Sequence, residues 1–192
     1  MTATAPSPAR GTRQLATVAE LSDEAKALLV ADEPAPPAFI AKLVEGEHFA
    51  DAVRFLAHAL PKRESVWWAW VAARNAAGPE PAPPIKNALE ATERWIVQPT
   101  EEHRRGAMVA GEAAEFGTAA GCAALAAFMT GGSMSPPDNP PVPPGEFMTA
   151  KAVAGSVTLA AVSKPDQAKT QFADFVRIGL EVAERTKLWD TK

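Results

Sequence analysis

Apolar residues recur along most of this chain at intervals of three and four positions, which is the spacing of amphipathic α-helices. No segment shows a convincing alternation of apolar and polar residues, the pattern of a half-buried strand. Short connections between helical segments favour antiparallel neighbours. We therefore expect an all-α fold, a single domain of about eight helices packed as antiparallel hairpins with proline-rich connectors. The helical patterns begin near residues 22, 37, 48, 61, 84, 100, 118, 146 and 165.

The most aromatic of these patterns includes Leu60–Trp70, which contains three of the chain's five tryptophans. Pro61 suits the first turn of a helix because its missing N–H would be unpaired there anyway. No further breaker occurs before Gly78. The sequence thus predicts one helix over residues 61–77, and its broad apolar surface requires several neighbouring helices to cover it.

Tryptophan and arginine share one face of that helix. Trp67 and Trp70 lie on the same side when there are 3.6 residues per turn. Arg63 and Arg74 extend this face, whereas Trp68 points elsewhere. We expect Trp67 or Trp70 to anchor the core. Because guanidinium groups stack on indole rings and both residue types are frequent in binding hot spots, the Arg63, Trp67, Trp70 and Arg74 face is also a candidate binding site.

The chain's 18 prolines cluster at residues 34–37, 79–84 and 136–144. The last cluster lies in segment 133–145, where six prolines exclude a helix and favour an extended, rigid loop. Such a loop either lies across an aromatic surface of the same molecule or is offered to a partner. The candidate binding residues in it are Pro140, Pro141, Pro143 and Pro144.

Composition places the helices in one domain. The chain has 192 residues, of which 47% are hydrophobic and 22% are charged, close to the averages of globular proteins and too few residues for two large domains. Residues 1–19 lack apolar periodicity, so we expect them to form a disordered N-terminal tail. The helical domain is then expected over residues 20–187, with a C-terminal tail over residues 188–192.

Charge and cysteine content narrow the range of partners and locations. The formal net charge of −4 argues against general affinity for nucleic acid or for an anionic membrane surface. The single cysteine, Cys122, permits no intrachain disulfide and no multi-cysteine metal site, which fits a cytoplasmic location. The longest uncharged stretch, residues 116–134, consists mostly of small residues, so we expect a buried helix there and no membrane insertion.

Candidate catalytic groups are few. The chain has three histidines and no tyrosine, and it lacks a zinc-protease motif, a phosphate-binding loop and a dinucleotide fingerprint. We expect Asp51, Arg54 and His58 to form a solvated helix face and Cys122 to be an inert core residue. The pair Arg104-Arg105 is too small for nucleic acid recognition. We therefore predict no catalytic residue, no metal site and no cofactor.

Three stretches carry a resemblance: Leu60–Trp70, Gly131–Pro144 and Lys151–Gly155. Together they resemble an uncharacterised bacterial all-helical family of unknown function, members of which are found near type VI secretion genes. The resemblance covers most of the chain from about residue 20 onward. It implies an accessory, adaptor or chaperone-like role in the cytoplasm. Because these motifs have no assigned chemistry, the resemblance transfers no catalytic residue.

The sequence is compatible with two functions. The favoured one is a non-enzymatic protein-interaction domain, an adaptor or chaperone associated with a type VI secretion system, because a catalytic set is missing and a proline loop is present. The alternative is a small ligand-binding domain or enzyme with a pocket that no motif reveals. A protein partner is expected, and a nucleic acid partner is not.

Overall fold

The computed structural model describes residues 11–29 and 33–190, and these residues form ten α-helices, one short 3-10 helix and no strand. The prediction of an all-α single domain is confirmed. The number of helices exceeds the expected eight or so, and one helix, α1, lies where a tail was predicted. The helices in chain order are α1 (Thr12–Val18), α2 (Asp23–Ala27), α3 (Pro36–Glu45), α4 (Phe49–Ala59), α5 (Lys62–Ala77), α6 (Pro83–Val97), α7 (Glu101–Ala113), α8 (Ala119–Phe128), α9 (Met148–Val162), the 3-10 helix η1 (Pro165–Gln167) and α10 (Ala168–Arg185).

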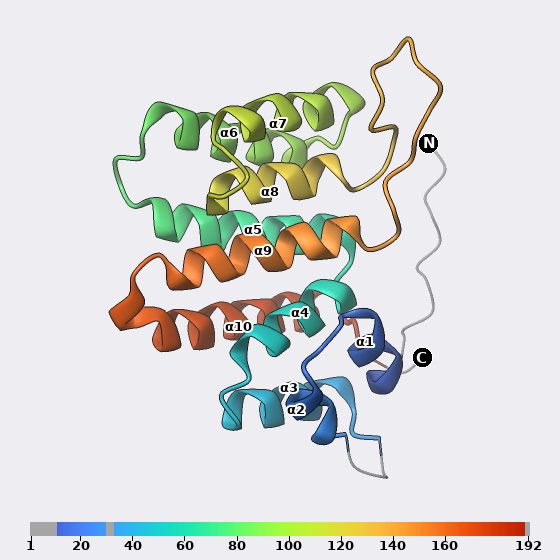
Figure 1. The fold of residues 1–192 in the computed structure, drawn as a ribbon, viewed down its shortest axis with the longest axis vertical. Helices are drawn as coiled ribbons and strands as arrows, with labels where there is room; N and C mark the ends of the chain where they lie inside the picture. The colour runs from blue at the N-terminus through green and yellow to red at the C-terminus, as the bar shows by residue number, and fades with distance from the viewer. Residues whose placement is uncertain (1–10, 30–32, 191–192) are drawn as a thin grey trace.

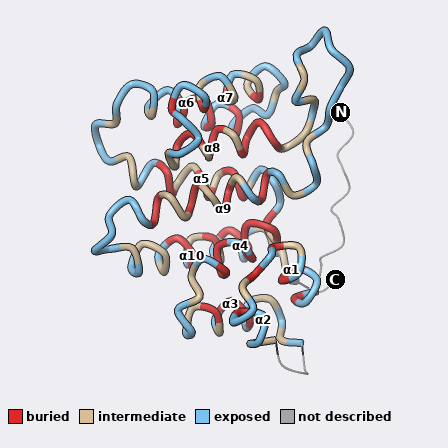
Figure 2. Tube along the Cα trace, in the orientation of Figure 1, coloured by how far each residue is buried: buried red, intermediate tan, exposed pale blue. Residues whose placement is uncertain are grey.

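The helices are stacked in layers along the long axis of the molecule (Figure 1). Helices α6 and α7 lie at one end, α8 follows, and α5 and α9 form the middle. Helices α4 and α10 lie beneath them with α1 beside α4, and α2 and α3 lie at the other end. Helix α9 contacts α5, α8, α4 and α10, so it joins the two halves of the stack. Buried residues line the inward sides of these helices and form one continuous hydrophobic core (Figure 2).

Three helix starts follow from local capping chemistry, and two others from proline. The side-chain oxygens of Ser22, Thr100 and Thr118 each accept a hydrogen bond from a backbone N–H in the first turn of the following helix, as an N-cap residue should. Helices α3 and α6 each begin with proline, one residue earlier than expected. Gly46 ends α3 with φ −80°, and the residue in the left-handed conformation is Glu47, with φ 60°.

The tryptophan helix has the expected bounds but a different anchor. Trp68 is completely buried, whereas Trp67 and Trp70 are each partly exposed. The indole N–H of Trp68 donates a hydrogen bond to the carbonyl oxygen of Phe175 at 2.8 Å, and a Cβ placed on Gly179 would lie 3.0 Å from the Trp68 ring. The prediction that Trp67 or Trp70 anchors the core is therefore wrong. The anchor is Trp68, because Gly179 in α10 leaves space for its ring.

The predicted N-terminal tail is also wrong over the residues that the structure describes. Helix α1 packs against α4, and Leu15 is only 3% exposed. The hydroxyl of Thr12 donates a hydrogen bond to the carbonyl oxygen of Pro34 at 2.6 Å. With only two turns, α1 is too short to show a helical period in the sequence. Residues 1–10 of the predicted tail lie outside the described residues.

The C-terminal boundary needs a similar correction. Helix α10 ends at Arg185, but Leu188 and Trp189 are partly buried and pack against the core. The N–H of Leu188 donates to the carbonyl oxygen of Ala183 at 3.0 Å, which turns the chain back onto the helix. The predicted tail therefore docks as far as Trp189, and residues 191–192 lie outside the described part of the chain.

Small residues allow α7 and α8 to approach closely. A Cβ on Gly111 would lie 3.1 Å from the Cβ of Ala124, and one on Gly121 would overlap the carbonyl oxygen of Glu115. Gly117, by contrast, has nothing within 4 Å. Across the described ranges, no helix combines the length and apolar character needed to cross a membrane.

Candidate protein-interaction site

The segment between α8 and α9 forms a loop that projects beyond the helical stack (Figure 1). Its two sides are joined at the base, because the N–H of Met134 donates to the carbonyl oxygen of Val142 at 2.8 Å and the N–H of Val142 donates to Ser133 Oγ at 3.0 Å. Nearer the tip, the N–H of Asn139 donates to the carbonyl oxygen of Pro136 at 3.1 Å. These bonds and the prolines define one loop conformation, and we call residues 133–145 the proline loop.

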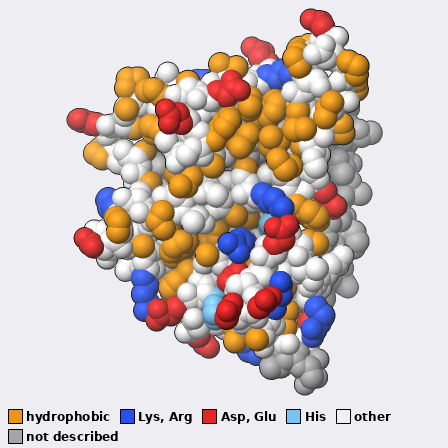
Figure 3. Space-filling view, viewed as in Figure 1, with side chains coloured by type: hydrophobic (Ala, Val, Ile, Leu, Met, Phe, Trp, Pro, Cys, Tyr) orange, Lys and Arg blue, Asp and Glu red, His pale blue; other side chains and the backbone are white. Residues whose placement is uncertain are grey.

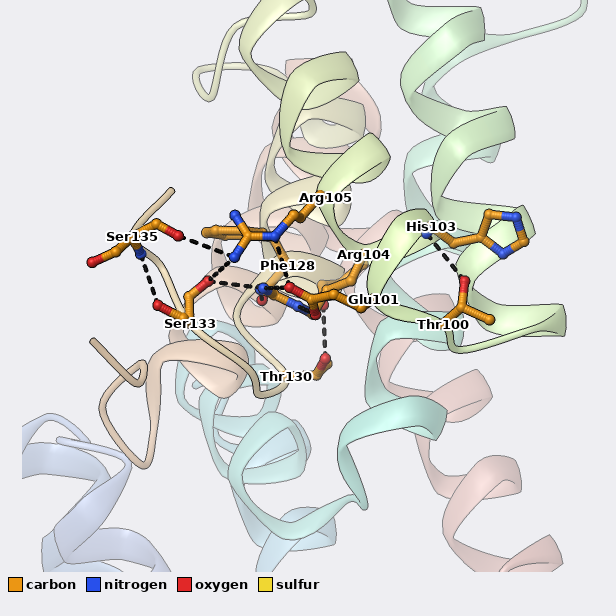
Figure 4. A network of polar contacts seen from close by, with 10 residues as sticks. Thr100, Glu101, His103, Arg104, Arg105, Phe128, Thr130, Ser133 and Ser135 are labelled. Atoms are coloured by element: carbon orange, nitrogen blue, oxygen red, sulfur yellow. Dashed lines mark hydrogen bonds and ion pairs between the residues drawn. The ribbon is translucent and has the colours of Figure 1, made fainter. Parts of the chain in front are cut away.

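A buried arginine fastens the base of the proline loop to the helices (Figure 4). Arg104, in the first turn of α7, is 4% exposed. Its guanidinium donates to the carbonyl oxygens of Phe128 at 2.6 Å and Ser133 at 2.8 Å, and it lies 4.4 Å from the centre of the Phe128 ring. Arg104 therefore connects α7, the end of α8 and the start of the proline loop.

Arg105 and Glu101 complete this brace. Arg105 donates to the carbonyl oxygens of Ser133 at 3.2 Å and Ser135 at 3.0 Å. The Glu101 carboxylate accepts from Arg104 at 2.6 Å and from Arg105 at 2.7 Å, so it holds both guanidinium groups over the proline loop. The hydrogen bond from Arg104 lowers the pKa of Glu101, although partial burial opposes this shift.

The sequence-based prediction missed this role, because charged residues near the start of a helix normally lie in water. The only signal was their spacing: Glu101 lies three residues before Arg104 and four before Arg105, which brings all three onto one face. The charged groups bond to the loop's backbone carbonyls rather than to nucleic acid phosphates.

The proline side chains themselves face solvent. Pro140, Pro141 and Pro143 are exposed and Pro144 is partly exposed. Val142 is 48% exposed although its backbone is bonded on both sides. The carbonyl oxygens of Ser133 and Ser135 therefore face the brace, while several proline rings and the side chain of Val142 are exposed. Apolar side chains also gather on the neighbouring surface over α8 and the base of the proline loop (Figure 3).

The residues of the predicted tryptophan and arginine face on α5 contact two different helices, α6 and α10. Arg63 Nε donates to the carbonyl oxygen of Ile96 at 2.8 Å, at the C-terminal end of α6. Trp70 Nε1 donates to the carbonyl oxygen of Leu89 in the same helix at 3.0 Å, and Arg74 lies 5.2 Å from the Trp70 ring centre. These contacts join α5 to α6, and a binding role for this face stays a prediction.

Trp67 turns toward α10 instead. Its cationic neighbour is Arg185, whose guanidinium lies 5.2 Å from the indole ring, rather than Arg63 or Arg74. The four predicted residues therefore do not form one cluster. Sequence periodicity placed them on one broad face, but it could not show that two helices divide that face.

The predicted solvated face on α4 is wrong for two of its three members. Asp51 is 6% exposed and accepts hydrogen bonds from the backbone N–H of Ser22 at 2.9 Å and its hydroxyl at 2.8 Å. His58 is 9% exposed, and its Nδ1 lies 2.8 Å from the carbonyl oxygen of Arg54, which can only accept, so Nδ1 carries a proton. Asp51 thus fixes the start of α2, a contact between residues 29 positions apart.

The remaining candidate groups are accounted for by local contacts. Cys122 is half-buried rather than fully in the core, and its S–H donates to the carbonyl oxygen of Phe116 at 3.0 Å. Burial raises the pKa of this thiol, which disfavours the reactive thiolate. His103 Nδ1 lies 2.8 Å from the carbonyl oxygen of Gln98, as expected for a helix-end interaction. The described ranges contain no cluster of three or more side chains suited to bind a metal ion.

These features define an all-helical domain that presents a braced proline-rich loop. The chain belongs to DUF6931, a family of unknown function whose model matches residues 39–183. The expected membership of a family of unknown function is thereby confirmed, with a match that begins later than residue 20. No curated protein and no solved structure matches the chain.

Proposed function

We propose that this protein is a non-enzymatic interaction domain whose proline loop binds a protein partner through an aromatic-lined groove on that partner. One observation carries the proposal: the base of the proline loop is fastened by Arg104 and Arg105, while Pro140, Pro141 and Pro143 are exposed. A loop whose function was only to connect α8 and α9 would need neither the brace nor the row of exposed rings.

The chemistry of the segment favours this kind of partner. The run Asn139–Pro144 contains prolines at two pairs of positions three residues apart, Pro140 with Pro143 and Pro141 with Pro144. Proline-rich segments adopt the polyproline II conformation, in which aromatic grooves contact the ring faces and the free carbonyls. Because the loop is already ordered, binding costs little further conformational entropy.

The biological setting of this interaction is also a proposal. We infer a cytoplasmic adaptor or chaperone role associated with type VI secretion, supported by the resemblance of the tryptophan segment, the proline loop and Lys151–Gly155 to a family found near such genes. The partner would then be a component or an effector of that system.

The experiment is site-specific photo-crosslinking in the native cell, followed by measurement with the purified partner. A photoreactive residue at Val142, on the proline loop, is expected to capture one main partner. The same residue at Val97, a valine 72% exposed at the end of α6, is the matched control and should not capture it. Equal capture from both positions would show that the proline loop is not the interface.

The second step separates binding from folding. Replacing Pro140, Pro141, Pro143 and Pro144 with serine should weaken binding to the captured partner by at least about tenfold, because the rings and the preformed backbone are both lost. The melting temperature should change little, since these side chains contribute little to the core. Unchanged affinity would contradict the proposal, whereas a large fall in melting temperature with intact binding would make the proline loop a structural brace.

A further inference from the structure

A second surface feature lies on the opposite side of α9 from the proline loop. The end of α1, helix α4 and helix α9 border an open surface hollow of about 480 Å³. Small and apolar residues of α9 form one wall, namely Ala154, Gly155 and Leu159. Such a volume falls within the range of small-molecule sites in proteins.

Charged side chains stand at the rim of this hollow. Lys151 Nζ lies 2.9 Å from Glu20 Oε1, and Arg54 donates a long hydrogen bond, 3.4 Å, to the backbone carbonyl oxygen of Glu20. Figure 3 shows charged side chains of both signs gathered where α1, α4 and α9 meet. Lys151 thus contacts the carboxylate of Glu20, whereas Arg54 contacts its backbone and also lies 3.4 Å from Asp51 Oδ1.

The Glu20 carboxylate is held weakly. Its side chain is 71% exposed and that of Lys151 is 50% exposed, so their ion pair is well solvated. Exposed pairs of this kind contribute little to stability, and a competing anion can replace one member at small cost. The hydrogen bond and the charge of Lys151 lower the pKa of Glu20.

We propose that this hollow binds a small organic carboxylate with a short apolar tail, whose carboxylate takes the place of the Glu20 carboxylate beside Lys151, with Arg54 also lining the hollow. The tail lies against Ala154, Gly155 and Leu159. The geometry supports this class of ligand because the cations are at the rim and the apolar wall lies next to them. A ligand that is only an anion would not use that wall, and a neutral ligand would not use the cations.

The test is a titration of the whole protein with hexanoate, followed by NMR of the backbone amides and by calorimetry. Hexanoate should perturb the amides of Lys151 and Gly155 at millimolar concentrations, whereas hexanamide and inorganic phosphate should bind at least about tenfold more weakly. Lys151→Gln should weaken hexanoate binding by about tenfold, because it removes a charge-assisted contact. Glu20→Gln should strengthen it by about threefold, because the internal competitor loses its charge.

The chain contains a closely matched control pair. Lys169 and Glu47 also form an exposed ion pair between distant segments, and Glu47, like Glu20, has a positive φ. Lys169→Gln and Glu47→Gln change the net charge in the same way, so both variants should bind hexanoate as the unaltered protein does. Phosphate binding as tight as hexanoate binding, or equal loss in Lys151→Gln and Lys169→Gln, would overturn the proposal. So would the absence of any perturbation at Lys151 and Gly155.

Discussion

Two regions of the molecule each join segments that are far apart in sequence, but different forces hold each region together. One is the contact between Trp68 and α10, and the other is the base of the proline loop. Trp68 is fully buried against Gly179 and makes one hydrogen bond, to a carbonyl oxygen 107 positions away. The proline loop is held by the guanidinium groups of Arg104 and Arg105 and by Glu101, which is 54% exposed.

This difference predicts how each region responds to change. Burying an indole removes roughly 150–250 Å² of mostly apolar surface from water, worth about 4–6 kcal/mol by area, and this contribution is insensitive to salt. The bonds that hold the proline loop exchange with water, so their net contribution is smaller and depends on charge. Damage to the first region should therefore unfold the domain, whereas damage to the second should free the loop.

The largest effect is expected at Trp68. Trp68→Ala should lower the free energy of unfolding by about 3–5 kcal/mol, because it leaves a cavity and removes the indole hydrogen bond to Phe175. Trp67→Ala should cost only about 1–2 kcal/mol, since part of that ring already contacts water. Urea denaturation followed by circular dichroism measures both values. Equal losses for the two variants would mean that the buried ring is not the anchor.

A smaller effect should follow from filling the space that Gly179 leaves for the Trp68 ring. Gly179→Ala should destabilise the domain by about 1–3 kcal/mol, because its Cβ would lie 3.0 Å from the Trp68 ring and 3.1 Å from Leu56. Gly106→Ala is the matched control, since Gly106 also lies within a helix and has nothing within 4 Å. That variant should gain about 0.5–1 kcal/mol from helix propensity. Thermal unfolding of both variants would show whether the signs are opposite.

The smallest effect on global stability is expected when the pH is lowered and Glu101, which braces the proline loop, becomes protonated. The pKa of Glu101 is below its usual value of 4.5, so its contribution is present above that pH and is lost as the pH falls through its folded pKa. Because Glu101 is half exposed, the loss should be below about 1 kcal/mol. The amide signals of Met134 and Val142 should shift in NMR spectra below about pH 4.5.

Glu101→Gln provides the control for that titration. It should remove the acid dependence of the Met134 and Val142 signals and leave the indole signal of Trp68 unchanged throughout. A Trp68 signal that moves together with the amides of the proline loop would show that the two regions unfold as one unit. The comparison would then be wrong.

Sequence alone was sufficient where the physics is local. The starts of α2, α7 and α8 follow from Ser22, Thr100 and Thr118, whose side chains satisfy first-turn N–H groups within three residues. The all-α class and the non-helical proline segment follow from periodicity and from the geometry of proline in the same way. These features need no distant partner, so they can be read directly along the chain.

Only the tertiary structure decided which groups are buried and which charges have a structural role. Helix α5 is apolar over more than half of its circumference, and the choice of Trp68 over Trp67 depends on the space above Gly179, a residue more than one hundred positions later. Arg104 is buried because the chain leaving α8 passes over it, and Asp51 is buried because α2 begins beside it. Such contacts join segments that no local pattern connects, since burial belongs to a pair of surfaces rather than to one residue.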